Sequence, residues 1–523
     1  MSHPLPTTPL PRRQVLIVFT GLILVMALGA LDQTVVATAL PTVVGDLGGV
    51  DELSWVVTAY LLASTATTPL WGKAGDLYGR RAVLRLAVVV FLVGSALSGA
   101  AWSMPALIGF RALQGAGAGG LMSLAMAVVG DLVPPRERGR YQGYIQAMFA
   151  LASVAGPLIG GVLTDQVGWR WAFYVNLPVG IVALAVISAV FRVPEERSPH
   201  QVDYLGAVLL VAGVSGLMLL SVWGGVRYPW ASWQVGVLAA ASVALLALFG
   251  WRQTRAAEPI LPPRLFRRRV FLVVSAAVFI ATCSLFAAVT FLPMYLQVVR
   301  GMTATNSGLL LLPLMLGITG ATTVSGRIIS ATGRYKIFPV VGLALTSAAL
   351  ALFATMDATT PWWVTLGIMV LMGVGFGMVT QVLLLAIQNV VDRRDLGTAT
   401  AATNFFRGLG GAFGVAVFGA VLSAGLSRWL PRELPAQASG TRVGDLLRSP
   451  ARIAALPGDV RHGIAVAVSQ SLHDVFLVAA PIAALGFLIV LLLKEYPLKG
   501  PAASGPRRED RSAAGERVPE GAS

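Results

Sequence analysis

The chain has 523 residues, and its composition is far more apolar than that of a globular protein. Apolar residues make up 56% of the chain and charged residues 12%, whereas a soluble domain carries about 25% charged residues. A bilayer-spanning helix needs roughly 20 mostly apolar residues. These values exclude a soluble protein and predict an all-α polytopic membrane protein that lies in a lipid bilayer.

The formal charge of +15 would suggest a nucleic-acid partner if the chain were soluble. Here, however, the cations gather in alternate segments between apolar stretches. With a cytoplasmic N-terminus, the inner segments hold 27 Lys and Arg and the outer loops hold 9, six of them in one long loop that the positive-inside rule discounts. The distribution predicts that both termini are cytoplasmic and that nucleic acid is not a partner.

Apolar stretches bounded by Arg, Pro, Gly or Trp predict fourteen membrane-spanning helices. A cleaved signal peptide is the alternative at the N-terminus, but the first stretch is long and contains Asp32, which favours an uncleaved span. The predicted spans cover about residues 14–40, 53–71, 82–103, 105–130, 141–164, 171–191, 203–222, 233–251, 270–297, 305–326, 337–356, 362–390, 398–425 and 473–493.

An internal repeat indicates how these spans are organised. GKAGDLYGRR, from Gly72, recurs as GRIISATGRYK from Gly326, and GAGAG followed by RERG, from Gly115, recurs as GVGFG followed by RDLG from Gly373. Chance similarity among glycine-rich helices is the alternative. The repeat predicts six spans, two inserted spans and six more. The predicted parts are a cytoplasmic N-terminus (1–13), a first bundle (14–191), two inserted helices with a linker (192–269), a second bundle (270–494) with an extracellular loop (426–472), and a disordered cytoplasmic tail (495–523).

Asp32 is the only acid well inside an apolar span of the first half. A lone carboxylate in a bilayer is costly unless it faces a cavity or takes up a proton. Asp32 is therefore a candidate proton carrier. Two alternatives remain open: it accepts a hydrogen bond in helix packing, or it attracts cationic substrates.

The fourth predicted span carries two polar residues on one face together with smaller and apolar ones. Its members follow helical spacing and share one side of the helix: Arg111, Gln114, Gly115, Ala118 and Met122. A buried guanidinium keeps its proton and needs an acceptor, which is either Asp32 or a carbonyl freed at a kink. The alternative is a purely structural bond between helices. The repeat places Met369 at the corresponding position, so this chemistry is confined to the first half.

Six sequence elements occur in order between about residues 15 and 495, and with them the chain resembles the fourteen-helix drug:proton antiporters of the major facilitator superfamily, the EmrB/QacA-like group. The resemblance implies the major facilitator fold and proton-coupled drug export, with Asp32 in proton coupling and Arg111 tuning it. The elements are LDQTVVATALP (31–41), GKAGDLYGRR (72–81), RALQGAGAGG (111–120), GPLIGG (156–161), WRWAFYVNLPVG (169–180) and FLPMYLQVVRG (291–301).

The fifth predicted span carries small residues four apart, a spacing that lets another helix approach closely. Its proline bends the helix. The resemblance makes this pattern the antiporter signature, with Ala152 where glycine is usual, although such ridges occur in any helical bundle. The residues are Ala152, Gly156, Pro157, Gly160 and Gly161.

The loop after the second span offers a cytoplasmic gate. Its glycines permit a tight turn, and its charges can pair with acids at the end of the fourth span in one transport state and separate in the other. Simple positive-inside anchoring is the alternative. The gate residues are Gly72, Asp76, Gly79, Arg80, Arg81, Asp131 and Glu137.

We expect a substrate cavity near the membrane midplane, between the two bundles. Apolar and soft side chains suit amphipathic compounds of varied shape. The tenth span has no acid, which argues against a broad range of divalent cations. The expected lining, besides Asp32, is Met26, Tyr60, Gln114, Met122, Gln146, Phe286, Tyr295 and Asn404, with Arg407 also polar at this depth.

The sequence thus predicts a secondary active exporter in the plasma membrane of a bacterium, driven by the proton gradient without a cofactor and functional as a monomer. A dedicated exporter of one endogenous antibiotic, lipid or siderophore is the alternative within this class. A membrane-embedded enzyme or a sensor is disfavoured, because no nucleophile triad, metal cluster, phosphate-binding loop or signalling domain is recognisable. The single cysteine, Cys283, excludes a disulfide framework.

Overall fold

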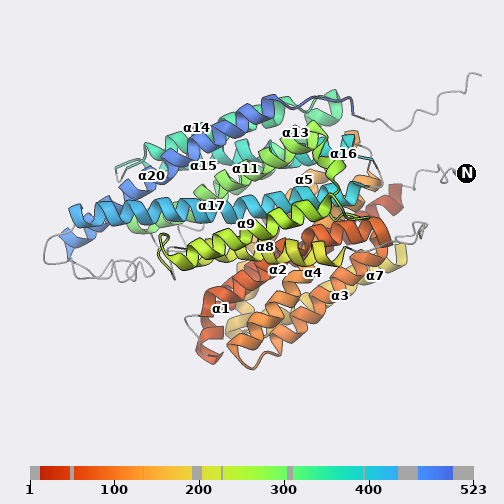
Figure 1. Cartoon of the computed structure of the whole chain (residues 1–523). Coiled ribbons are helices and arrows are strands. Elements are labelled where there is room, and N and C mark those ends of the chain that lie inside the picture. The colour runs from red at the N-terminus through yellow and green to blue at the C-terminus, as the bar shows by residue number, and fades with distance from the viewer. Residues whose placement is uncertain are drawn as a thin grey trace, which may run out of the picture.

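The computed structural model describes residues 12–47, 52–133, 135–190, 203–224, 228–302, 310–357, 359–392, 395–433 and 457–498. Within these ranges the chain is helical and has no strand, only an isolated bridge between Gly224 and Tyr228. The long helices run roughly side by side (Figure 1). The prediction of an all-α protein is therefore confirmed.

The first part of the chain forms α1 (Arg12–Leu47), α2 (Leu53–Tyr78), α3 (Arg80–Gly99), α4 (Met104–Leu132), α5 (Pro135–Gln166), α6 (Trp171–Tyr174) and α7 (Asn176–Val190). The inserted part forms α8 (Tyr204–Trp223), α9 (Trp233–Gln253) and the short α10 (Pro263–Phe266). The last part forms α11 (Arg269–Met294), the π-helical η2 (Tyr295–Val299), α13 (Leu312–Thr332), α14 (Ile337–Ala354), α15 (Trp362–Gly377), α16 (Thr380–Val390), α17 (Leu396–Glu433) and α20 (Gly458–Leu491).

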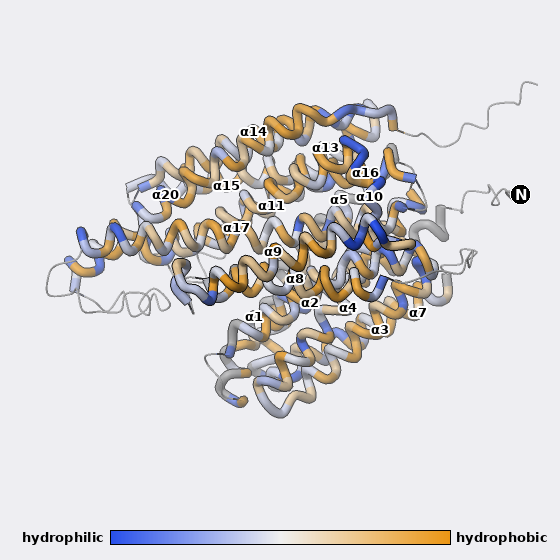
Figure 2. The backbone as a smooth tube through the Cα atoms, in the orientation of Figure 1, coloured by the Kyte–Doolittle hydropathy of each residue, from blue (hydrophilic) through white to orange (hydrophobic). Residues whose placement is uncertain are grey.

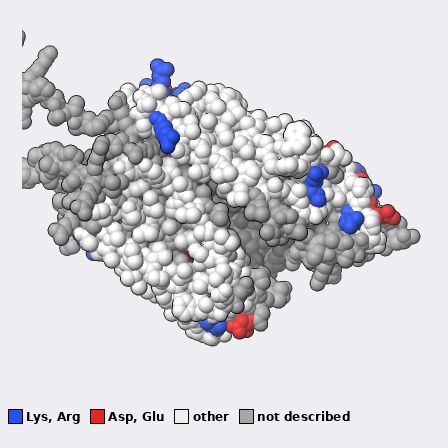
Figure 3. Space-filling view, turned by 180° about the vertical axis from the view of Figure 1, so that it is seen from behind, with Lys and Arg blue, Asp and Glu red and all other residues white. Residues whose placement is uncertain are grey.

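Eleven helices of the described chain are long and apolar enough to cross a membrane. Apolar residues extend along most of their length, with hydrophilic residues concentrated toward helix ends and loops (Figure 2). The face in Figure 3 shows the same distribution, since Lys, Arg, Asp and Glu gather toward its ends. Helices α2 and α5 fall outside this set, and the apolar part of α8, Tyr204–Leu220, is shorter. The chain is thus a multi-pass membrane protein, and the number fourteen stays a prediction.

The helices differ in detail from the predicted spans. The first predicted span (14–40) agrees with the apolar segment Ile17–Leu40, although α1 continues through Pro41 to Leu47. The span predicted over 362–390 agrees with the apolar segment Trp362–Val390, within which the structure separates α15 from α16. The loop predicted over 426–472 is much shorter, because α17 extends to Glu433 and α20 begins at Gly458. The start of α20 is helical because its apolar positions recur every three or four residues and are buried, as at Ile464, Ala467 and Val468.

The first and last parts of the chain are built alike. Helix α1 packs on α5 as α11 packs on α17, and α2 packs on α4 as α13 packs on α15. The contacts between the two parts follow the same correspondence, because α5 packs on α13 and α17 packs on α2. We call these parts the first half (12–190) and the second half (269–498). Helix α8 packs on both α2 and α17, so the inserted helices touch both halves.

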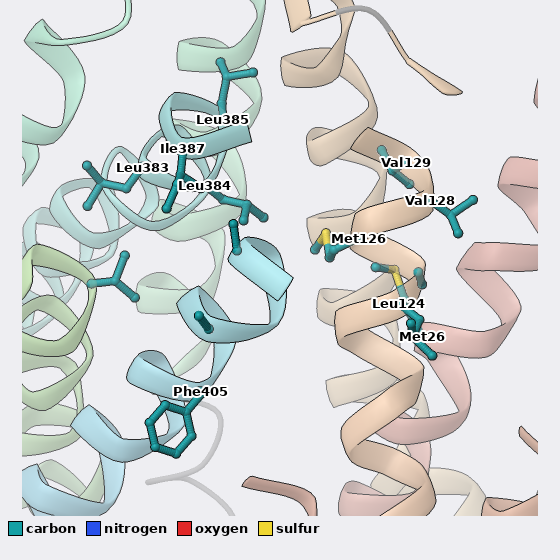
Figure 4. Close-up of a cluster of buried hydrophobic side chains, with 14 of the residues drawn as sticks. Met26, Leu124, Met126, Val128, Val129, Leu383, Leu384, Leu385, Ile387 and Phe405 are labelled. Carbon is teal, nitrogen blue, oxygen red and sulfur yellow. The ribbon is translucent and has the colours of Figure 1, made fainter. Parts of the chain in front are cut away.

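The halves meet through a shared apolar core at one end of the bundle. In Figure 4, Met126 and Val129 of α4 lie across from Leu384 of α16 and Phe405 of α17, and these residues belong to one buried cluster. Next to this core, Gln388 donates a hydrogen bond to the carbonyl oxygen of Met126 at 3.3 Å. This end also contains Asp76, and we refer to it as the Asp76 end and to the opposite one as the Trp169 end.

The segment after α9 is tied to both halves at the Asp76 end. Glu258 forms an ion pair with Lys73 of α2 at 2.9 Å. Arg264 pairs with Asp395 at 2.5 Å, just before α17. The inserted helices themselves are joined by Asp203, which accepts hydrogen bonds from Gln253 at 3.0 Å and from Arg252 at 3.1 Å.

Candidate functional site

The carboxylate of Asp32 lies in the middle of α1 and is fully buried. It accepts three hydrogen bonds from side chains of the described residues. Arg111 donates from Nη1 at 2.6 Å, Gln114 from Nε2 at 2.7 Å and Asn176 from Nδ2 at 2.9 Å. The donors belong to α4 and α7, so one carboxylate connects three helices.

Arg111 satisfies its guanidinium with several neighbours at once. Besides its ion pair with Asp32, it donates from Nη1 to the Gln114 side-chain oxygen at 2.7 Å and from Nε to the carbonyl oxygen of Val56 at 3.2 Å. The ring of Tyr60 lies against the guanidinium, 4.2 Å from its central carbon, a cation–π geometry. Of the two acceptors that the sequence left open, Asp32 is present, and the carbonyl oxygen of Val56 is a further main-chain acceptor.

Sequence reasoning missed two members of this network. Asn176 lies at the start of α7, within the WRWAFYVNLPVG element, and also donates to Ser95 Oγ at 3.0 Å. Ser95 of α3 donates onward to the carbonyl oxygen of Phe173 at 2.8 Å. The sequence did contain a signal for them, namely an asparagine and a serine inside otherwise apolar spans. Because buried polar groups almost always form hydrogen bonds, such residues indicate a polar network.

The residues around Asp32 are enclosed within the first half rather than exposed on an open wall. Met26, Tyr60, Gln114 and Arg111 each have at most 1% of their surface exposed. Met122 is partly buried and packs against the central apolar core. Placing Met26, Tyr60 and Gln114 on a cavity wall is therefore wrong for this arrangement, because packing against neighbouring helices covers them. The side chain of Gln146 lies outside the described residues.

The glycine ridge of α5 packs on α1. A Cβ added at Gly156 would meet the side chain of Thr34, and one added at Gly160 would lie 2.7 Å from the carbonyl oxygen of Val35. Thr34 also donates a hydrogen bond to the carbonyl oxygen of Ala152 at 3.3 Å. The contact of α1 with α5 therefore extends to Ala152, the first residue of the ridge.

Two residues of the predicted signature stand apart from this contact. A Cβ added at Gly161 would meet nothing within 4 Å, so including Gly161 in the packing motif is wrong. Its place one residue after Gly160 turns it away from α1, since residues one apart do not share a helix face. The side chain of Pro157 lies outside the described residues.

At the Asp76 end, a carboxylate of the first half binds the first turn of a helix in the second half. Asp76 Oδ1 accepts from the Gly397 amide at 2.9 Å, and Oδ2 accepts from the Thr398 amide at 2.6 Å and from the Thr398 hydroxyl at 2.7 Å. Free amides and the helix dipole make the start of α17 a favourable place for a negative charge. Gly72 brings α2 close, because a Cβ there would lie 2.9 Å from the carbonyl oxygen of Gly397.

The predicted charge pairs are only partly those observed. Arg80 pairs with Asp131 of α4 and with Asp76 at 3.1 Å. Gly79 makes the turn between α2 and α3 with a φ of 86°, which favours glycine. Arg81, placed in the gate by its sequence, donates instead to the carbonyl oxygen of Ser188 near the end of α7. Arg81 thus fastens the first half internally, because the turn at Gly79 directs it away from the second half.

The side chain of Glu137 lies outside the described residues. The Asp76 gate therefore consists, among the residues described, of the α17 contact and the Arg80 pairs.

The second-half residues expected in the cavity separate into two groups. Phe286 lies within α11, and Asn404 and Arg407 lie in the first third of α17. Tyr295 directly follows α11, about 39 Å from Arg269 along the axis of that helix. Its hydroxyl donates a hydrogen bond to the carbonyl oxygen of Asp357 at 2.6 Å. Placing Tyr295 near the midplane is wrong, because α11 is long enough to carry it to the Trp169 end.

A separate hollow of about 550 Å³ lies at the Trp169 end. Its lining includes Asp46, which accepts hydrogen bonds from Trp169 Nε1 at 2.9 Å and from Arg170 at 2.8 Å. These two hydrogen bonds hold the pKa of the Asp46 carboxyl below its ordinary value. The hollow is distinct from the Asp32 network. Within the described ranges, no cluster of three or more His, Cys, Asp or Glu is arranged to hold a metal ion.

Comparison with known proteins agrees with this architecture. Residues 22–415 match the model of the Major Facilitator Superfamily. An MFS-type transporter of Mycobacterium tuberculosis is 44% identical over 92% of this chain and 70% of its own. The multidrug transporter protein MdtP of Bacillus subtilis is 35% identical over 95% of this chain and 96% of its own.

Among solved structures, the human organic anion transporter MFSD10 superposes with a TM-score of 0.63. It covers 92% of this chain and 99% of its own at 18% identity, a likeness of fold alone. The family match covers most of the chain, and the family is one of transporters rather than enzymes. The chain belongs to the major facilitator superfamily.

Proposed function

We propose that this transporter exports amphipathic compounds from the cytoplasm or the inner leaflet in exchange for protons. The observation that carries the proposal is the buried Asp32 carboxylate with its donors Arg111, Gln114 and Asn176. A carboxylate at such depth is costly unless it is paired or takes up a proton. Relatives named as an efflux pump and as a multidrug transporter support export as the direction of transport.

Protonation of Asp32 would change the contacts of three helices at once. A neutral acid no longer balances the charge of Arg111, so the connection between α1, α4 and α7 weakens. Helix α1 also packs closely on the glycine ridge of α5. Because α5 packs on α13 of the second half, a shift of α1 would be passed to the contact between the halves.

The contact of Asp76 with α17 represents one of two alternating arrangements. It holds the halves together at the Asp76 end, which we place in the cytoplasm because Lys and Arg are concentrated in the loops there. Export requires this end to open and admit substrate, so the carboxylate must leave the first turn of α17. Rocking of two halves about a central site is the motion that such a repeat-built transporter permits.

The wider proposal is a protein of fourteen spans in a bacterial plasma membrane, with both termini in the cytoplasm, acting as a monomer. The proton gradient serves as the energy source, and no cofactor is needed. Each elementary charge that crosses the field supplies about 2.3 kcal/mol per 100 mV.

Reconstituted vesicles test the role of Asp32. Asp32→Asn keeps the shape of the side chain but fixes the neutral form. We expect this variant to exchange a neutral dye downhill and to lose accumulation driven by an imposed pH gradient. Asp32→Glu should retain part of the accumulation driven by the pH gradient. Asp46→Asn, which alters an exposed carboxylate at the Trp169 end, is the control and should transport as the wild type does.

Two outcomes would contradict the assignment. If Asp32→Asn loses only cationic compounds and still accumulates neutral ones with the gradient, Asp32 attracts substrate and does not carry the coupling proton. If gradient-driven export of every compound is undiminished, the proton site lies elsewhere.

A further inference from the structure

Helix α17 carries two neighbouring polar side chains without partners. In Arg407, Nε and Nη2 are both shielded from solvent and have no hydrogen-bond partner among the described residues. In Asn404, three residues earlier, the same holds for both Nδ2 and Oδ1. Residues three apart share a helix face. Since buried polar atoms are nearly always paired, four unpaired atoms on one face indicate a group that is missing from this arrangement.

The surroundings place this pair where the two halves meet. Gly408 and Gly411 follow Asn404 at spacings of four and seven, on the same face of α17. A Cβ added at Gly408 would lie 3.0 Å from the methyl carbon of Thr65 in α2, and one added at Gly411 would lie 3.0 Å from the ring of Phe286 in α11. The face of α17 that carries the pair therefore also meets a hydroxyl-bearing side chain of the first half and an aromatic ring of the second half.

The pair also lies inside α17, which is long and apolar enough to cross a membrane. Arg407 follows Gly397, the residue bound by Asp76, by ten positions. Ten helical residues place Arg407 about 15 Å along the helix from that contact.

No acid of the described residues compensates the charge of Arg407. The sequences of α11, α13, α14, α15 and α16 contain no Asp or Glu, and the only acid in α17 is Glu433, at its far end. Asp32 is already occupied by Arg111, Gln114 and Asn176. Arg407 is only partly exposed, so a charge there without a counter-charge is unfavourable, and a guanidinium cannot relieve this by losing its proton.

We propose that Asn404 and Arg407 bind the carboxylate of an amphipathic organic anion, which is the substrate class of this transporter. Nε and Nη2 form one edge of the guanidinium and can donate two parallel hydrogen bonds to the two oxygens of a carboxylate. Asn404 Nδ2 supplies a further donor, and the ring of Phe286 offers apolar surface to the rest of the molecule. This inference rests on the export function proposed above and specifies its substrate.

Binding to the purified full-length protein tests the proposal. The protein is placed in phosphatidylcholine nanodiscs, which contain no anionic lipid. The probes are 1-pyrenebutyrate and its primary amide, which share one apolar body and differ in charge. We expect the wild type to bind the carboxylate at least about tenfold more tightly than the amide, as expected of hydrogen bonds between charged groups.

Three variants and one control separate charge from geometry. Arg407→Gln should bind both probes equally. Arg407→Lys should keep part of the preference for the carboxylate, because a lysine offers a point charge without the paired donors of a guanidinium. Asn404→Ala should weaken carboxylate binding several-fold. Arg327→Gln removes the same charge from an exposed position of α13 and should leave the preference unchanged. Thermal unfolding of Arg407→Gln should occur at the wild-type temperature or above it, since a partly buried charge without a counter-charge is removed.

The proposal is overturned if the wild type binds the two probes equally, if Arg407→Gln keeps the preference, or if Arg407→Gln unfolds at a lower temperature, which would show a structural partner. Competition by added phosphatidylglycerol would assign the site to a lipid head group instead. A wild type that exports cationic dyes with a pH gradient but has no carboxylate preference refutes this inference alone. Arg407-dependent carboxylate binding without any gradient-driven export refutes the proposed coupling alone.

Discussion

The two arginines at depth in this protein differ in what surrounds them. Arg111 is neutralised by Asp32 and shares its remaining donors with Gln114 and Val56. Arg407 has unpaired donors on one edge of its guanidinium. The same chemical group therefore stabilises a closed network in the first half and presents an open binding edge in the second half.

Asn176 should support transport through its hydrogen bond to Asp32. Asn176→Ala removes one of the three donors to this carboxylate, a loss of about 1.5 kcal/mol, which weakens the connection of α7 to α1. Gradient-driven export should therefore fall by about tenfold. Ser95→Ala is the matched control, because it removes a neighbour of Asn176 and leaves all three donors to Asp32 in place. Undiminished export by Asn176→Ala would show that its hydrogen bond to Asp32 has no role in transport.

At the scale of helices, the contact of α1 with α5 depends on the missing side chains of two glycines. Gly156 and Gly160 let Thr34 and Val35 of α1 approach the α5 backbone. Helix α1 also carries Asp32, so this close contact with α5 lies on the same helix as the buried carboxylate. Close packing of this kind transmits small displacements because protein interiors have few voids.

Gly160→Leu should abolish export while the protein still inserts and accumulates in the membrane. The added side chain would overlap the backbone of Val35 and push α1 away, and overpacking of this kind costs about 1–3 kcal/mol or more. Gly161→Leu adds the same bulk one position later, where nothing lies within 4 Å of an added Cβ, and should export normally. Efflux of a fluorescent dye, normalised to membrane expression, compares the two. Wild-type efflux by Gly160→Leu would contradict the packing role.

At the scale of the whole molecule, the two halves are held together at the Asp76 end by one carboxylate on the start of α17 and by the apolar core beside it. The ion pairs of Lys73 with Glu258 and of Arg264 with Asp395 link the segment after α9 to both halves at the same end. The inserted part therefore lies against the interface between the two halves and contacts both of them.

Asp76→Asn should open the Asp76 end. The amide keeps one acceptor but loses the charge that binds the amides and dipole of α17, which shifts the balance between open and closed forms by about tenfold, or about 1.4 kcal/mol. A cysteine in place of Met126, which is 1% exposed in the closed form, reports the change in a Cys283→Ser background. Its labelling by a water-soluble maleimide should rise in Asp76→Asn and stay low in the control Asp46→Asn. Equal labelling in both would leave Asp76 as a residue at the end of α2 without a gating role.

Much of the architecture was predictable because membrane-spanning helices are recognised by their long runs of apolar residues. Apolar runs of about 20 residues located most helices, and the scarcity of acids in them singled out Asp32 and Arg111, since polar groups at depth are costly and need partners. Glycines spaced by four predicted a close helix contact, because residues without side chains on one helix face let another helix approach. The start of α20 was missed because its polar residues, such as Arg461 and His462, mask an apolar stripe.

Contacts between distant segments were decided only by the tertiary structure. The sequence by itself determined that Asp32 and Arg111 lie at depth, but the fold decided that Asn176 of α7 joins them and that Asp76 binds the first turn of α17, 321 positions away. Helical periodicity states which face of a helix a residue occupies and carries no information on which helix that face meets. The unpaired edge of Arg407 likewise became evident only when α2 and α11 were packed around it, because pairing is a property of neighbours in space.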